Sequence, residues 1–182
     1  MFGCRRDHEV AACLPCSNGA HADPKAHAEL EALWQSVAHD VWKEGALELT
    51  CVCFGAGPSA SVEGRSIELT ASWERREQAA RAAHLALHRK RPPWDARSQD
   101  TCEARVGRAL TLEAEAHELE LAARQSLGVT TQRYPFEPEY WAAPAPQRRA
   151  WLLAYFRSHP EGDGVVPGFA SQYRARCGAS PG

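Results

Sequence analysis

The first regular pattern of apolar and polar residues runs from Asp23 to Gly45. Asp23 and Pro24 form an N-cap and first-turn pair, and Gly45 is suited to end a helix. Between them, large apolar residues recur at helical spacing: Leu30, Leu33, Trp34, Val37 and Val41. The pattern predicts an amphipathic helix that begins at Pro24 and ends before Gly45.

Two later segments alternate between apolar and polar residues. Residues 47–53 place leucine and cysteine side chains on one face, and residues 67–73 repeat the alternation with isoleucine, leucine, alanine and tryptophan. A period of two residues predicts β-strands. The connection from Gly55 to Gly64 is rich in glycine, serine and proline, so we expect an antiparallel hairpin with a mobile loop.

Helical sequence dominates the second half of the chain. Residues 74–91 are rich in alanine, arginine and leucine, and the proline pair that follows ends the helix they predict. A further helix is predicted from Asp100 to Leu127, with Asp100 and Glu103 as a capping box and Gly128 as the C-terminal cap.

The remaining segments are shorter. The prolines of residues 134–146 predict an irregular stretch whose aromatic side chains cover the core. A short helix is predicted from about Pro146 to Arg157. The tail from Pro160 is expected to be irregular, with Cys177 as the residue that could pin it.

This order of helix, hairpin, helix, helix and helix predicts an α+β fold. We expect a small antiparallel hairpin or sheet with about four helices packed on it. A chain of 182 residues suits one domain with a substantial core. We therefore assign residues 1–22 to an irregular cysteine-rich leader, 23–159 to the single domain, and 160–182 to an irregular tail.

Composition argues against two kinds of partner. Apolar residues make up 44% of the chain and charged residues 24%, and the net charge is -2. A net negative charge gives no reason to expect binding to a phosphate backbone, so nucleic acid is not an expected partner. No apolar run approaches the roughly 20 residues of a transmembrane helix.

The seven cysteines bear on where the protein is located. Residues 1–4, Met-Phe-Gly-Cys, resemble the end of a bacterial lipoprotein signal without its preceding apolar region, which makes Cys4 a candidate lipid anchor. Six cysteines then remain, an even number that is compatible with three disulfides in an exported protein. We expect an exported protein of the periplasm or cell envelope, with a cytoplasmic protein carrying reduced thiols as the alternative.

The helix predicted over residues 100–127 carries polar side chains on its apolar face. At about 100° per residue, Glu113 and His117 fall among the apolar positions. A buried carboxylate and imidazole are costly unless they are paired or bound to a metal. His84 and His88 lie at the edge of the preceding helix's apolar stripe, so all four could share one site. A self-satisfied i,i+4 pair of Glu113 and His117 is the alternative.

Two short motifs add a family resemblance. Residues 84–88, His-Leu-Ala-Leu-His, and residues 113–117, Glu-Ala-Glu-Ala-His, follow predicted strands in an order that resembles the core of the zincin metallopeptidases. The glutamate-type branch carries an H-E-x-x-H helix and a later helix with a glutamate ligand. The resemblance covers roughly residues 24–128. It implies zinc as the cofactor, with His84, His88 and Glu113 as ligands and His117 in a supporting position.

Leu85 is the main departure from that family. It stands where a zincin carries the glutamate that takes a proton from zinc-bound water and passes it to the leaving group. Leucine can do neither, so the resemblance implies a pseudoenzyme that keeps the fold, with or without the metal.

A second candidate site lies near the N-terminus. Cys13, Cys16, His21 and His27 follow a C-x₂-C-x₄-H-x₅-H spacing close to that of small zinc knuckles. The residues between them include one lysine and no aromatic residue, unlike a knuckle that binds nucleic acid. A structural metal, or disulfide bonding of Cys13 or Cys16, are the two interpretations.

Three functional hypotheses follow. The first is a non-catalytic zincin-like binding or structural protein, exported, with an unidentified protein or peptide as its partner. The second is an active zinc peptidase or other hydrolase that uses a non-standard general base. The third is a metal-free, disulfide-stapled helical interaction protein.

Overall fold

A computed structural model describes residues 16, 19–37, 52–56, 61–63, 66–95 and 98–178. The chain divides into two compact units. The single domain expected over residues 23–159 stays a prediction. The first unit comprises Met1–Lys90 and Leu119–Val129, and the second comprises Arg91–Glu118 and Thr130–Gly182. Helix α5 (Cys102–Ser126) contributes residues to both units.

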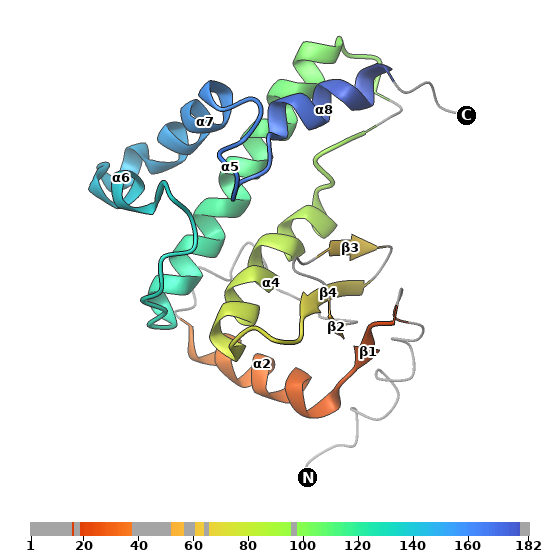
Figure 1. The fold of residues 1–182 in the computed structure, drawn as a ribbon, viewed down its shortest axis with the longest axis vertical. Coiled ribbons are helices and arrows are strands. Elements are labelled where there is room, and N and C mark those ends of the chain that lie inside the picture. The colour runs from red at the N-terminus through yellow and green to blue at the C-terminus, as the bar shows by residue number, and fades with distance from the viewer. Residues whose placement is uncertain are drawn as a thin grey trace. The chain divides into compact units, whose positions relative to one another are not determined.

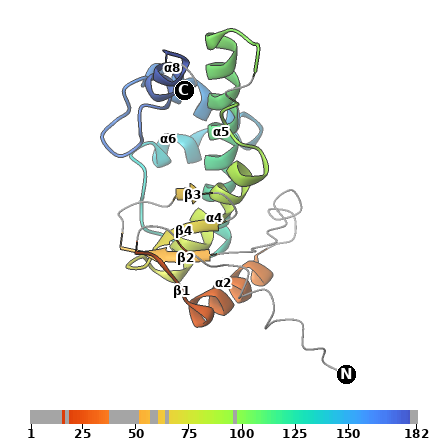
Figure 2. The same cartoon turned by 90° about the vertical axis from the view of Figure 1, so that its right-hand side faces the viewer.

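The first unit is built on a four-stranded mixed sheet (Figures 1 and 2). Its strands are β1 (His21–Ala22), β2 (Val52–Gly55), β3 (Ser61–Glu63) and β4 (Ser66–Thr70), in the spatial order β1-β2-β4-β3. Strands β2 and β4 are parallel, while β1 and β3 add antiparallel edges. Together with the helices, this sheet confirms the predicted α+β class. The zincin-like core stays a prediction.

The predicted antiparallel hairpin is wrong, because β2 pairs with β4 in parallel, with Val52 opposite Ile67 and Phe54 opposite Leu69. The expected loop contains β3, which reverses the chain direction and lets β4 run alongside β2. Alternation of apolar residues shows which face of a strand is buried, and it carries no information on strand direction.

Helix α4 (Arg75–Lys90) packs on this sheet, and helix α2 (Pro24–Ser36) packs against α4. The Asp23 side chain caps α2 by accepting hydrogen bonds from the backbone N–H groups of Lys25 and Ala26, as predicted. The helix ends at Ser36, earlier than predicted, because Val37 adopts an extended conformation. Val41 lies outside the described residues. Most of the buried residues of α4 are alanines, which allow close packing.

Helix α5 confirms the predicted helix over residues 100–127 and corrects its N-terminus. The N-terminal cap is Thr101, whose Oγ1 accepts a hydrogen bond from the N–H of Ala104. The expected capping box does not form, because Asp100 pairs with Arg108 and Glu103 pairs with Arg174. At the C-terminus Gly128 has φ +68°, as expected of a glycine cap, and the N–H of Val129 bonds to the carbonyl of Arg124.

The second unit is helical in its described residues. It contains the first part of α5 with α6 (Glu137–Ala142), a 3₁₀ turn η2 (Ala145–Gln147), α7 (Arg148–Ser158) and α8 (Phe169–Gly178). Helix α7 confirms the predicted short helix. Helix α6 lies in a stretch predicted to be irregular. It tolerates its proline because the residue is in the first turn, where its missing N–H would have no helical partner.

The tail predicted to be irregular contains α8. A disulfide joins Cys177 of α8 to Cys102 at the start of α5. This covalent link explains how a short C-terminal helix with little periodicity is held in place, and Cys177 pins the tail. Among the described residues, no helix is both long and apolar enough to cross a membrane.

Candidate functional site

Helix α4 carries the two histidines one turn apart. His84 is 2% exposed and lies among the alanines that pack against the core, whereas His88 is partly buried. Nε2 of His84 lies 3.0 Å from Nε2 of His88, and the ring centroids are 4.6 Å apart. The two imidazoles therefore meet through equivalent nitrogen atoms.

A buried carboxylate from α5 lies on the other side of His84. Oε2 of Glu120 is 3.2 Å from Nδ1 of His84 and 2.8 Å from Nη1 of Arg81. Glu120 is 1% exposed, so these contacts stand in place of its hydration. Arg81, Glu120, His84 and His88 form one connected set within the first unit, which we call the His84 cluster.

Without a metal, the contacts of the His84 cluster determine which ring nitrogen atoms carry a proton. The Glu120 carboxylate favours a proton on Nδ1 of His84, which leaves Nε2 of that ring as an acceptor. Nε2 of His88 then donates the hydrogen bond between the two rings. In this state the contact between the two rings pairs a donor with an acceptor.

The same atoms fit the geometry of a metal site. Two imidazole nitrogens bound at about 2.0–2.1 Å to a tetrahedral zinc lie roughly 3.3 Å apart. The observed 3.0 Å between the two Nε2 atoms is within a few tenths of an ångström of that separation. A carboxylate behind a histidine ligand is the usual way in which proteins fix the tautomer and orientation of the ring.

Leu85 lies in the hydrophobic core. Its side chain is 4% exposed and belongs to the same apolar cluster as Ile67 and Leu69 of the sheet. The position that carries the catalytic base in a zincin thus contributes to packing in this protein.

A second buried ion pair lies along the same two helices. Arg124, which is 2% exposed, pairs with Glu77 of α4. Sequence reasoning missed both Glu120 and Arg124. They follow His117 by three and seven residues, so the helical count that identified Glu113 and His117 would have found them if it had been continued.

Glu113 and His117 occupy a buried environment in the second unit. Oε1 of Glu113 accepts a hydrogen bond of 2.5 Å from the hydroxyl of Tyr173. Burial, together with the nearby Glu113 charge, raises the pKa of Tyr173 above its usual range, so its hydroxyl stays protonated and donates. Burial of Glu113 and His117 agrees with their position on the apolar face of α5.

His117 is surrounded by aromatic rings. Its Nδ1 lies 2.9 Å from the carbonyl oxygen of Glu113, so the expected i,i+4 contact runs to the backbone of Glu113. The rings of Tyr134, Phe156 and Phe169 lie 5.1 to 5.5 Å from the imidazole. Aromatic packing and the contact with the Glu113 carbonyl therefore hold the His117 ring in place.

The zinc ligands implied by the zincin resemblance fall in different units. His84 and His88 belong to the first unit and Glu113 to the second. His84, Glu113 and His117 are each buried and each carry a side chain that can ligate a metal. Joint binding of one ion by His84, His88 and Glu113 stays a prediction.

The proposed knuckle loses one of its ligands. Cys16 forms a disulfide with Cys53 of β2, and an oxidised sulfur cannot act as a thiolate ligand. His21 is exposed in β1, and Nε2 of His27 lies 3.9 Å from a carboxylate oxygen of Glu31. Cys13 lies outside the described residues. The interpretation of Cys16 as a disulfide cysteine is the one that the structure supports.

The two disulfides, Cys16–Cys53 and Cys102–Cys177, indicate an oxidising compartment.

No protein-family model, curated protein or solved structure matches the chain. The zincin resemblance of residues 24–128 therefore stays a prediction.

Proposed function

We propose that this protein is a non-catalytic zinc-binding protein in which Nε2 of His84 and Nε2 of His88 hold the ion. The observation that carries the proposal is the convergence of these two atoms at 3.0 Å, with the Glu120 carboxylate 3.2 Å from the far nitrogen of His84. Two imidazoles supply half of a tetrahedral shell, and zinc binds neutral imidazole well.

The lack of catalysis follows from the groups around the two histidines. A zinc hydrolase needs a base that takes a proton from metal-bound water. Leu85 cannot serve, and the Glu120 carboxylate is occupied by Arg81 and His84. A metal in the His84 cluster would therefore bridge two successive turns of α4 and orient a binding surface. We place the second hypothesis, an active hydrolase, behind this one for that reason.

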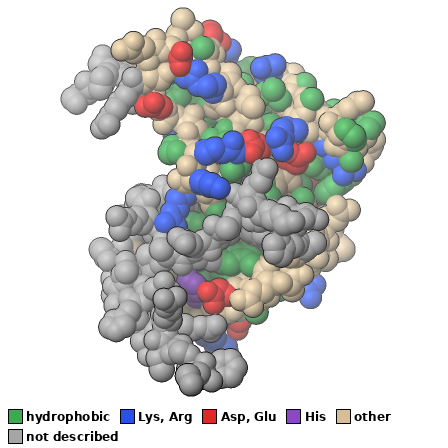
Figure 3. Space-filling view, turned by 180° about the vertical axis from the view of Figure 1, so that it is seen from behind, with side chains coloured by type: hydrophobic (Ala, Val, Ile, Leu, Met, Phe, Trp, Pro, Cys, Tyr) green, Lys and Arg blue, Asp and Glu red, His purple; other side chains and the backbone are tan. Residues whose placement is uncertain are grey.

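We also propose that the protein is exported and binds a protein or peptide partner. The two disulfides support export, since such bonds persist outside the reducing cytosol. The face drawn in Figure 3 carries interspersed acidic and basic side chains, which is typical of a solvated surface. A lipid anchor at Cys4 stays a prediction, because Cys4 lies outside the described residues.

Zinc content per chain tests the proposal. Purified wild type, without added metal, is compared with a His84→Ala, His88→Ala double variant by elemental analysis. We expect about one zinc per chain in wild type and none in the double variant. His159→Ala is the matched control, because His159 is exposed at the end of α7 and should leave the zinc content unchanged.

Two outcomes would contradict the proposal. Wild type without zinc, even after dialysis against zinc and removal of excess metal, would favour the metal-free hypothesis. Equal zinc in wild type and the double variant would place the ion elsewhere in the chain. Circular dichroism of both variants checks that the loss of zinc does not simply follow unfolding.

A further inference from the structure

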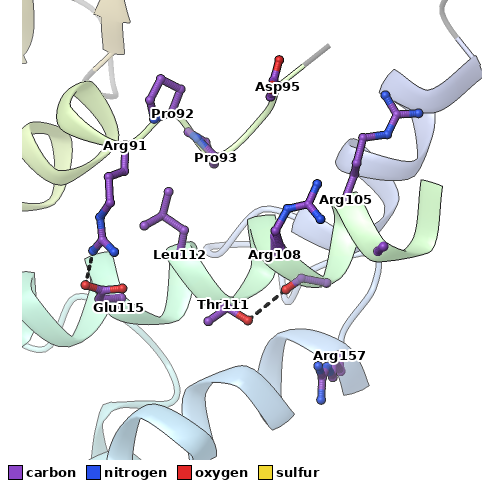
Figure 4. A pocket seen from close by; sticks show the side chains of 12 residues that line it. Arg91, Pro92, Pro93, Asp95, Arg105, Arg108, Thr111, Leu112, Glu115 and Arg157 are labelled. Atoms are coloured by element: carbon purple, nitrogen blue, oxygen red, sulfur yellow. Dashed lines mark hydrogen bonds and ion pairs between the residues drawn. The ribbon is translucent and has the colours of Figure 1, made fainter. Parts of the chain in front are cut away.

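The second unit contains a pocket that is independent of the His84 cluster. It lies between residues 91–95 and the first half of α5, and it measures about 570 Å³ (Figure 4). Pockets of roughly 300–1,000 Å³ are of the size that takes small molecules. Both walls belong to the second unit, so the pocket is formed within one compact part of the chain.

Arginine is the most frequent residue in the lining. Four arginines contribute to it, against two carboxylates from Asp95 and Glu115: Arg91, Arg105, Arg108 and Arg157. Arg91 pairs with Glu115. Among the lining side chains, arginine therefore exceeds carboxylate, in a protein whose net charge is -2.

Two of these arginines are not neutralised by a carboxylate partner. The guanidinium of Arg105 lies 4.9 Å from the ring centroid of Trp94, and its Nε is buried without a hydrogen-bond partner in the described part of the chain. Arg157 is exposed and forms no ion pair within the described ranges. Neither guanidinium group therefore has a carboxylate partner in the described part of the chain that would compete with an anionic ligand.

Arg108 can also turn to a ligand. Its present partner, Asp100, lies 2.7 Å away, and both side chains are more than half exposed. Exposed ion pairs of this kind contribute about 0–1 kcal/mol, so an anion in the pocket competes with Asp100 at small cost. The side chain of Arg108 extends from α5 toward the segment that carries Pro93 (Figure 4).

The rest of the lining is apolar and stiff. Leu112 projects from α5 into the space between Arg91 and Arg108 (Figure 4), and Pro93 with the preceding proline forms the opposite wall. Prolines have a fixed φ, so this wall is largely set before a ligand arrives. Such a surface suits the apolar body of a ligand whose charged end meets the arginines.

We infer that this pocket binds a small organic anion, a carboxylate or phosphate monoester attached to an apolar body. The planar guanidinium groups of Arg105 and Arg108 bind the anionic head, because their geometry matches two oxygen atoms of either group. Arg157, which lines the pocket from α7, adds positive charge to it. The apolar body lies against Leu112 and Pro93. This site goes beyond the proposed zinc function and shares no residue with it.

Calorimetric titration of the full chain tests the inference. The probes are phenyl phosphate and benzoate, and benzyl alcohol is the neutral control of similar shape. We expect saturable one-to-one binding of at least one anion, with weaker or no binding of the alcohol. We also expect the affinity to fall as salt is added, because the contact is electrostatic. Comparison of the two anions identifies which head group the pocket favours.

Paired variants locate the binding. Arg108→Gln combined with Arg157→Gln should weaken binding of the anion by at least about tenfold, since each charge-assisted hydrogen bond contributes about that much. Arg149→Gln is the matched control, because it removes one positive charge from an exposed position of α7 outside the pocket. It should leave the affinity unchanged.

Three results would overturn the inference: no saturable binding of either anion, equal binding of benzyl alcohol, or equal loss of affinity in Arg149→Gln. Both pocket substitutions are at exposed positions, so the variants should fold, and their melting temperatures check this. Single Arg157→Gln gives the same test without disturbing the Arg108–Asp100 pair.

Discussion

Oε2 of Glu120 lies between two partners, Nδ1 of His84 at 3.2 Å and Nη1 of Arg81 at 2.8 Å. One carboxylate oxygen thus holds both a guanidinium and an imidazole of α4 against α5. The carboxylate compensates the Arg81 charge and, at the same time, sets the orientation of the imidazole. The two roles can be separated by substitution.

Glu120→Gln keeps the size of the side chain and removes its charge. We expect zinc affinity to fall about 10–100-fold, the usual effect of losing a carboxylate behind a histidine ligand. Stability should fall by about 1–3 kcal/mol, because the largely buried Arg81 loses its anionic partner. Competition with a zinc chelator and urea unfolding measure the two effects.

The control for this substitution is Glu29→Gln. Glu29 pairs with Arg75 in the same unit at 2.9 Å, but both side chains are partly exposed. Its removal should change stability by less than about 1 kcal/mol and leave zinc affinity intact. Unchanged zinc affinity in Glu120→Gln would show that Glu120 does not support the ion.

Leu85→Glu restores the residue that a zincin carries at this position, and we expect it to unfold the protein without creating peptidase activity. The Leu85 side chain is 4% exposed in the core, and burying an unpaired carboxylate there should cost about 3 kcal/mol or more. Leu85→Met keeps the volume and should cost less than about 1.5 kcal/mol. Thermal unfolding and peptide hydrolysis are measured together. A stable Leu85→Glu variant that cleaves peptides would contradict the assignment of Leu85 to packing.

Tyr140 predicts a loss of stability in alkaline solution. Burial raises the pKa of Tyr140 to about 12, whereas the unfolded chain titrates near 10.0. Because the pKa is higher in the folded state, the neutral hydroxyl of Tyr140 makes its full contribution to the free energy of unfolding below pH 10. This contribution is lost as pH rises from 10 to about 12. The loss from Tyr140 amounts to about 2–3 kcal/mol.

Urea unfolding between pH 9 and pH 12 checks this dependence, where wild type should lose stability steeply. Tyr140→Phe should show a shallower decline, because phenylalanine does not ionise. Some decline should remain, since the pKa values of Tyr155 and Tyr173 are also raised. Identical slopes in wild type and Tyr140→Phe would show that Tyr140 is not the group that resists ionisation.

Local signals along the chain were sufficient to predict much of the helical structure. The proline pair after α4 and Gly128 after α5 end their helices through effects that act within one or two turns. Both helix ends could therefore be predicted. Burial of Glu113 and His117 followed from helical periodicity alone.

The failures have equally specific causes. The direction of β4 relative to β2 depends on β3, a three-residue strand whose sequence is typical of a loop. Helix α6 was missed because its first-turn proline was read as a breaker. The partners of His84 depend on which face of α5 meets α4, and a single sequence contains no direct record of that contact. The role of Glu120 therefore emerged only from the folded arrangement.

The pairing of Cys16 with Cys53 and of Cys102 with Cys177 has a consequence for how the chain matures. Each of these bonds joins consecutive members of the four bridged cysteines, so the two loops follow one another without interleaving. In the proposed export, the chain would pass a translocation pore with its N-terminus first and would expose Cys16 and Cys53 before either cysteine of the other pair. The earlier bond can close without competition from the later pair. For these four cysteines, the order of emergence itself favours the native pairing.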